Sequence, residues 1–298
     1  MTWPQRVILL TLILQISACA SLRRKPGAGS YSTHKLNVTG MERSYVKYVP
    51  AGGPPRMLLV LLHGGGGSAE KMLRLAADLP QLADRHSLLL IYADGIANSW
   101  NDGRSDITQA ARQKIDDIGF LRAIQSAASA EFGIRLSFAA GISNGGMMAQ
   151  RVACELSDVF RGVVSVAANL SAELAPECAP ASAVSVMFIN GVHDEIVPYA
   201  GGDVQVLGRR RGRVLSTEDS LAFWQKHNHC TSRAEQKMTE QSYRRDYDCK
   251  NAQLTLIRVE NGGHAWPGGT QYLPEFVVGH ATREFSASQK IVDFMLAH

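Results

Sequence analysis

The chain has 298 residues, of which 45% are hydrophobic and 19% are charged, and its formal net charge is +4. This composition supports a large buried core and excludes a disordered or fibrous chain. The basic residues form only short runs, at Arg23–Lys25 and Arg209–Arg213, with no nucleic-acid motif beside them. We therefore expect one globular domain and no nucleic-acid partner.

The N-terminus predicts an export signal. An early arginine, Arg6, is followed by an uncharged apolar run over Val7–Ile16 and then by small residues. The run is shorter than the ~20 residues that a membrane span needs, so we expect a cleaved signal peptide over residues 1–18. Ile16-Ser17-Ala18-Cys19 resembles the lipobox of bacterial lipoproteins, in which the cysteine is acylated. The predicted product is a periplasmic or cell-surface lipoprotein that meets the membrane only through Cys19, or otherwise a secreted protein with an ordinary signal peptide.

Four cysteines remain after lipidation of Cys19, and an even number in an exported protein predicts two disulfides. Proximity in the sequence favours Cys154 with Cys178 and Cys230 with Cys249, among the three connectivities that four cysteines allow.

Apolar periodicity predicts the fold class. Residues 19–35 are polar, basic and without apolar periodicity, which predicts a flexible tether, and the folded domain is expected over residues 36–298. Short apolar runs predict strands over residues 57–63, 87–93, 134–141, 162–168, 184–190 and 253–260. Amphipathic stretches predict helices over residues 69–79, 116–132, 145–156, 217–228 and 286–297. This alternation predicts an α/β fold with a mostly parallel central sheet and helices on both faces, whose reactive groups follow the carboxyl ends of the strands.

Ser143 lies between two glycines in Gly141-Ile142-Ser143-Asn144-Gly145, which matches G-x-S-x-G. The motif falls where a predicted strand ends and a predicted helix begins. A serine on such a turn projects its hydroxyl above the sheet, and the first amides of the helix face the developing oxyanion. The context favours a nucleophile over a serine that only fills a tight turn.

A serine hydroxyl requires a histidine base and an acid that orients the base. In this fold class they follow in the order Ser, Asp or Glu, His. Asp194 follows the predicted strand at 184–190, and His264 follows the predicted strand at 253–260. Chain order and position therefore favour Asp194 as the acid and His264 as the base.

Four other ionisable residues are weaker candidates. His193 would break the chain order as a base, and Glu195 is the alternative acid. Asp116 and Asp117 precede an apolar helical stretch and fit the acidic first turn of a helix.

The run Leu61–Ala69, LLHGGGGSA, follows the first predicted strand and resembles the HGGG-type motif of esterases and lipases. Consecutive glycines let the backbone approach a reacting carbonyl closely. The candidate oxyanion donors are the amide of Asn144 and that of Gly64 or Gly65.

No cofactor or metal is expected. The glycine run lacks the Lys-Ser/Thr pair of a phosphate-binding loop, because Lys71 is too far along the chain. Zinc is disfavoured because no C-x-x-C pair occurs and His227 and His229 have no matching partner pair.

Aromatic and amide residues near these loops are candidate walls of a substrate pocket, with core packing as the alternative. Tyr92, Trp100 and Asn101 follow the second predicted strand, and Trp266 flanks His264.

Several segments taken together resemble the polyhydroxybutyrate depolymerase and feruloyl esterase group of α/β-hydrolases. They are GISNGGMMAQRVACE, LLHGGGGSA, YADGIANSWNDGR, DDIGFLRAI, GVHDEIVPY and NGGHAWPGG. The resemblance runs from about Glu42 to the C-terminus. It implies that residues 36–298 are an α/β-hydrolase catalytic domain and that the protein is a secreted serine carboxylic ester hydrolase. Ser143, Asp194 and His264 match the family's triad, and the HGGG loop matches its oxyanion segment.

The resemblance does not select among polyesters, hydroxycinnamate esters and acetylated sugars. Depolymerases that attack solid polyester typically carry a separate polymer-binding module. No segment of this sequence has the pattern expected of such a module. We therefore expect a soluble or short oligomeric ester substrate. An inactive or weakly active α/β-hydrolase-fold envelope lipoprotein that binds a ligand is the alternative, and a peptidase or acyltransferase with the same triad is a further one.

Overall fold

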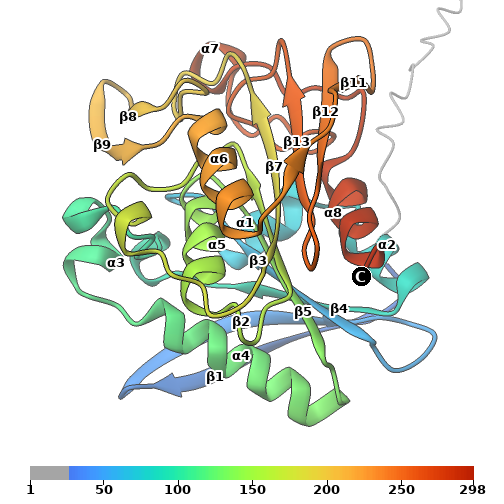
Figure 1. Ribbon diagram of the computed structural model, residues 1–298. Helices are drawn as coiled ribbons and strands as arrows, with labels where there is room; N and C mark the ends of the chain where they lie inside the picture. The colour runs from blue at the N-terminus through green and yellow to red at the C-terminus, as the bar shows by residue number, and fades with distance from the viewer. Residues whose placement is uncertain (1–26) are drawn as a thin grey trace, which may run out of the picture.

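The computed structural model describes residues 27–298, and the predicted signal peptide and Cys19 lie outside these residues. Residues 27–298 form an eleven-stranded sheet with helices on both faces (Figure 1). The strands lie in the order β1, β2, β4, β3, β5, β6, β7, β13, β12 and β10, with β11 paired to β12. The predicted α/β-hydrolase type of fold, with a mostly parallel sheet between helices, is confirmed.

The centre of the sheet is parallel and coincides closely with the six predicted strands. These strands, in spatial order, are β4 (Leu88–Ala93), β3 (Met57–Leu62), β5 (Leu136–Ile142), β6 (Gly162–Val166), β7 (Ser185–Gly191) and β13 (Leu254–Val259). Their carboxyl ends therefore meet at one edge of the sheet.

The sheet separates two hydrophobic cores, because alternate side chains of each strand point to opposite faces. In β3, Leu58, Val60 and Leu62 enter the first core, whereas Leu59 and Leu61 enter the second. The first core packs under α4 (Asp117–Phe132), α5 (Asn144–Glu155) and α6 (Thr217–His227). The second packs under α1 (Ala69–Leu75), α2 (Leu79–His86) and α8 (Ala287–Leu296). Each fully buried leucine contributes about 1.5–3 kcal/mol, so both layers stabilise the central strands.

The folded domain begins earlier than the sequence predicts. Ser30–Val38 forms β1, which pairs antiparallel with β2 (Met41–Val49), so residues 30–35 of the predicted tether belong to the sheet. β1 is an edge strand whose side chains are mostly exposed, and an exposed strand needs no apolar alternation. Its pairing with β2, across a turn at Thr39 and Gly40 with positive φ, orders it instead.

The predicted helix at residues 69–79 is divided. α1 begins at its N-cap Ser68 and ends before Ala76, and α2 begins at Leu79 with Pro80 in its first turn. Proline fits the first turn of a helix but not its interior, so it marks the start of the second helix.

Several short elements carried too little apolar signal to be predicted. The antiparallel strands are β12 (Ser242–Asp248), β10 (Thr231–Ser232) and β11 (Gln236–Lys237), and a separate hairpin is formed by β8 (Gly202–Val206) and β9 (Arg209–Val214). The short helices are α3 (Gln109–Arg112), α7 (Glu275–Val278), η1 (Ile96–Asn98), η2 (Ser105–Ile107) and η3 (Ala175–Glu177). Over residues 27–298, none of the helices combines the length and the apolar character that crossing a membrane requires.

Both predicted disulfides are present. Cys154, near the end of α5, bonds to Cys178, and Cys230, after α6, bonds to Cys249, after β12. The first bond therefore ties the helix that follows Ser143 to a neighbouring loop.

Removal of the first disulfide by Cys154→Ser with Cys178→Ser is expected to lower the free energy of unfolding by about 2–4 kcal/mol, because the crosslink restricts the unfolded chain. Urea unfolding without reductant measures the effect. The paired variant Cys230→Ser with Cys249→Ser is the matched comparison, since its sequence separation of 19 is close to the separation of 24 in the first bond. Unchanged unfolding midpoints in both variants would contradict the expectation.

Candidate functional site

Ser143 alone connects β5 to α5, and it forms a sharp turn. Its φ of 56° and ψ of −123° lie in a region that L-residues rarely adopt and that costs of order 1–3 kcal/mol. Gly141 and Gly145 make the turn possible, because a side chain on Gly145 would overlap the Leu62 carbonyl, and one on Gly141 would overlap the Gly145 carbonyl. The G-x-S-x-G pattern thus has a steric reason in this chain.

The Ser143 backbone is fixed while its hydroxyl is free. The amide donates to Val166 O at 2.9 Å, and the carbonyl accepts from Met147 N at 2.9 Å. The residue is partly exposed, and its hydroxyl makes no hydrogen bond within residues 27–298. Catalytic hydrogen bonds are often long in structures without substrate and shorten in the substrate complex.

Asp194 and His264, which are distant in sequence, lie in contact. Asp194 follows β7, His264 follows β13, and both are buried. His264 Nδ1 lies 2.8 Å from Asp194 Oδ2. Because an ionised carboxylate only accepts hydrogen bonds, Nδ1 carries the proton and Nε2 of the neutral ring is left as an acceptor.

Two backbone amides orient the Asp194 carboxylate. Its Oδ1 accepts from Ile196 N at 2.9 Å and from Val197 N at 2.8 Å, which leaves Oδ2 for the imidazole. On the other side, the Tyr272 hydroxyl donates to His264 O at 3.0 Å. Tyr272 was not among the predicted site residues, because a tyrosine in a polar loop carries no local signal of that contact.

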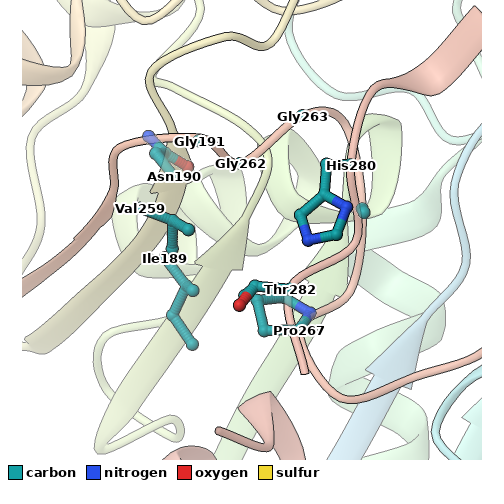
Figure 2. Close-up of a pocket in the computed structure, with 10 residues that line it drawn as sticks. Ile189, Asn190, Gly191, Val259, Gly262, Gly263, Pro267, His280 and Thr282 are labelled. Atoms are coloured by element: carbon teal, nitrogen blue, oxygen red, sulfur yellow. The ribbon is translucent and has the colours of Figure 1, made fainter. Parts of the chain in front are cut away.

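The loops that carry Asp194 and His264 pack against each other at the ends of β7 and β13. The His193 amide donates to Gly262 O at 3.0 Å. A side chain on Gly191 would overlap that same carbonyl, so glycine is required for the approach. Gly191, Gly262, Gly263 and His280 are among the residues that line a small cavity at this junction (Figure 2).

The rival ionisable residues have other environments. His193 and Glu195 are exposed, so neither shares the buried pair. Asp116 caps α4 by accepting from Gly119 N at 2.7 Å. Asp117 is buried and pairs with Arg43 at 2.7 Å. Burial raises the pKa of Asp117 above its ordinary value, although the Arg43 guanidinium opposes the shift. Asp116 and Asp117 therefore have structural roles.

The glycine loop after β3 lies beside Ser143. A Cβ placed on Gly64 would lie 3.4 Å from Ser143 Cβ, and one on Gly65 would lie 3.9 Å from Asn144 Cβ. The amides of Gly64, Gly65 and Asn144 make no hydrogen bond within residues 27–298. Three unbonded donors thus belong to the two segments that flank the serine.

His63 holds this loop. Its Nδ1 donates to Gly64 O at 2.7 Å, and its Nε2 accepts from Gly95 N at 3.0 Å. Acceptance at Nε2 requires a neutral ring, and burial lowers the pKa of His63. His63 therefore has a structural role that needs its uncharged form.

The four candidate pocket residues serve mainly in packing and hydrogen bonding. Tyr92, Trp100 and Trp266 are fully buried, and the last donates its indole N–H to Ser288 Oγ at 3.2 Å. The Asn101 side chain donates to Ile115 O at 3.1 Å. The three aromatic side chains therefore leave almost no surface for a substrate, whereas Asn101 is partly exposed. The sequence signals were an aromatic or amide side chain and a position near the site loops, and neither distinguishes a core from a pocket.

Comparison with known proteins establishes the family. The chain is 31% identical over 298 residues to "Putative esterase NocK" of Nocardia uniformis subsp. tsuyamanensis, covering 92% of this chain and 86% of that protein. This chain belongs to the esterase family of NocK.

Two further similarities are more limited. Feruloyl esterase B of Piromyces equi is 29% identical over 131 residues, which cover 43% of this chain and 24% of that protein. The structure of an acetyl xylan esterase from Aspergillus awamori matches with a TM-score of 0.58 at 10% identity, covering 90% of this chain and all of that one. The match to the acetyl xylan esterase shows a shared fold alone. No protein-family model matches the chain.

The described part of this esterase-family chain holds no cluster of three or more His, Cys, Asp or Glu residues with the arrangement of a metal site. His227, at the end of α6, packs edge-on against Trp224, and its neighbour His229 adopts a positive φ.

The neutral state of His63 predicts a dependence of stability on pH. Its folded pKa lies below the unfolded value of about 6.5, so on acidification the unfolded chain binds a proton that the folded chain does not. The free energy of unfolding should therefore fall as the pH decreases from about 7 to about 5.5, and fall less in His63→Gln. Urea unfolding across this range measures both. His298, whose pKa burial also lowers, is present in both proteins. Parallel pH profiles would contradict the assignment.

Proposed function

We propose that this chain is a serine carboxylic ester hydrolase in which Ser143, Asp194 and His264 form the catalytic triad. The observation that carries the proposal is the buried contact of 2.8 Å between His264 and Asp194, in loops at the same edge of the sheet as the strained turn at Ser143. Membership in the esterase family of NocK supports the reaction class.

The reaction proceeds by acyl transfer in two steps. His264 Nε2 takes the Ser143 proton as Oγ bonds to the ester carbonyl carbon, and Asp194 stabilises the resulting imidazolium. The tetrahedral intermediate collapses, the C–O bond to the alcohol breaks, and His264 returns the proton to the leaving oxygen. Water then attacks the acyl-enzyme by the same route, which releases the acid and restores Ser143.

The negative oxygen of each intermediate is bound by backbone amides. The donors are Asn144 N and the amide of Gly64 or Gly65, which are the unbonded amides beside the serine. Preorganised donors of this kind contribute about 2.7–4 kcal/mol each to the transition state.

The proposed substrates are soluble or short oligomeric esters of the polyhydroxybutyrate depolymerase and feruloyl esterase type, met outside the cytoplasm. The names of NocK and feruloyl esterase B support an ester substrate, and the two disulfides support export. The proposed lipid anchor at Cys19 would hold the enzyme at the cell envelope. A ligand-binding lipoprotein without activity is less favoured, because it gives no reason for a strained serine beside unbonded amides.

Replacement of the nucleophile tests the triad. Ser143→Ala and His264→Ala should each lower kcat by about 10⁴-fold or more, and Asp194→Asn by less. Hydrolysis of a p-nitrophenyl ester measures the rates, and a fluorophosphonate should label wild type but not Ser143→Ala.

Ser137→Ala is the matched control. It makes the same change on β5, the strand that leads to Ser143, and the buried Ser137 hydroxyl has no hydrogen-bond partner. This variant should keep wild-type activity. Near-normal turnover by Ser143→Ala would refute the proposal.

Comparison of kcat/KM on methyl ferulate and on a soluble 3-hydroxybutyrate oligomer defines the ester, with Ser143→Ala as the blank. We expect turnover of at least one of these soluble esters and poor clearing of a suspension of insoluble polyester. Efficient clearing of the suspension by the purified protein would contradict the proposed substrate class. Activity on no ester would favour the binding-protein alternative.

A further inference from the structure

The two segments with unbonded amides come from distant parts of the chain. Gly64 and Gly65 follow β3, whereas Asn144 begins α5. An oxyanion needs donors from both segments within about 3 Å, so their separation must be fixed closely. Glycine has no side chain with which to fix it. The pairing of β3 with β5 sets where both segments begin, so contacts from another element are needed only to fix the glycine loop beyond β3.

Trp100 makes hydrogen bonds to both segments. Its indole Nε1 donates at 2.9 Å to His63 O, the carbonyl directly before Gly64. Its backbone N donates to Asn144 Oδ1 at 2.8 Å, and its backbone O accepts from Asn144 Nδ2 at 3.1 Å. One fully buried residue thus joins the glycine loop to the first residue of α5.

The Asn144 side chain is also fixed from a second direction. Its Nδ2 donates to Asp102 Oδ2 at 2.5 Å, and Asp102 pairs with Arg104 at 2.6 Å. Arg104 in turn donates to Arg211 O in β9 at 2.5 Å. Asp102 and Arg104 are both buried. The segment that carries Trp100 is therefore also bonded to α5 and to β9, through Asp102 and Arg104, without any contribution from the glycine loop.

The same connection between β4 and α4 also holds the glycine loop at other points, one of which is a hydrogen bond of 2.7 Å from Asn98 Nδ2 to Gly67 O. Gly66 N donates to Asn98 O at 2.8 Å, and Gly95 N donates to the His63 ring. The rings of His63 and Trp100 lie 5.0 Å apart. The indole bond is distinct among these contacts, because the residue that makes it also bonds to Asn144.

We propose that Trp100 is a positioning residue that sets the spacing between the two oxyanion donors. The proposal rests on the proposed ester hydrolysis and adds a residue that touches neither substrate nor reacting atoms. Without the indole N–H, both donors remain but the glycine loop can shift relative to Asn144. The transition state is then less well stabilised, while binding of the uncharged ester carbonyl changes little.

Trp100→Phe tests this proposal, since phenylalanine keeps an aromatic ring in the core and lacks the N–H donor. We expect kcat to fall about 10- to 100-fold, the range associated with misplacement of catalytic groups by up to about 1 Å. KM should stay within about twofold of wild type, because ground-state binding is retained. The rate of fluorophosphonate labelling should fall with kcat, while labelling of Ser143 still goes to completion.

Trp224→Phe is the matched control. Trp224 is fully buried, and its Nε1 donates to Gln150 Oε1 at 2.6 Å. This variant loses the same donor and similar volume, and its hydrogen bond reaches α5 at Gln150, six residues beyond Asn144, and not the glycine loop. Both variants should lose similar unfolding free energy, and only Trp100→Phe should lose kcat. Equal kcat in the two variants, or a change confined to KM, would overturn the proposal.

Asn144→Ala tests the other link and gives an answer if Trp100→Phe does not fold. It keeps the backbone amide and removes both side-chain bonds to Trp100. The expected result is again a lower kcat with KM little changed, and an unchanged kcat would overturn the proposal. If wild type is active and labelled at Ser143 but Trp100→Phe and Asn144→Ala have the same kcat as the Trp224→Phe control, only the role of Trp100 is refuted. Wild type that neither hydrolyses esters nor labels at Ser143 would refute both this role and the proposed function.

Discussion

The parallel pairing of β5 with β3 on one side and β6 on the other is the constraint on which the rest of the site depends. Gly141 is in register with Leu62 of β3 and with Ser165 of β6, so β5 ends level with the glycine loop. The chain must then turn into α5 within one residue, and only glycines at positions 141 and 145 leave room for this. The strained backbone of Ser143 persists because packed strands and a buried helix fix both of its neighbours.

Buried ion pairs in and beside the connection between β4 and α4 form the second layer of support. Arg43 pairs with Asp117 and lies 4.1 Å from the Phe120 ring centre, and Asp102 pairs with Arg104. Removal of one partner from such a pair leaves an uncompensated buried charge and costs about 3–5 kcal/mol. These groups are therefore tied to a single arrangement. That arrangement is what presents Trp100 and the Asn144 side chain to the site.

The Asp194 and His264 loops depend on a different physical feature, which is close backbone packing. Glycines on both loops let the chain after β7 approach the chain after β13, and the His193 amide bonds across the gap. Amides of the Asp194 loop fix one carboxylate oxygen and leave the other for the imidazole. The orientation of the histidine is thus set by backbone geometry.

Periodicity predicted the parallel strands, which are buried on both faces, and most of the long helices. Chain order and the positions of the strand ends also predicted that Asp194 and His264 would lie in contact. β1 was not predicted, because an exposed edge strand is ordered by its partner and not by its own apolar pattern. Only the tertiary structure decided that Trp100 and Trp266 belong to the core, and that Asp102 holds Asn144. The physical reason is that local sequence encodes burial and turns, whereas hydrogen bonds between distant loops exist only after the sheet has brought the loops together.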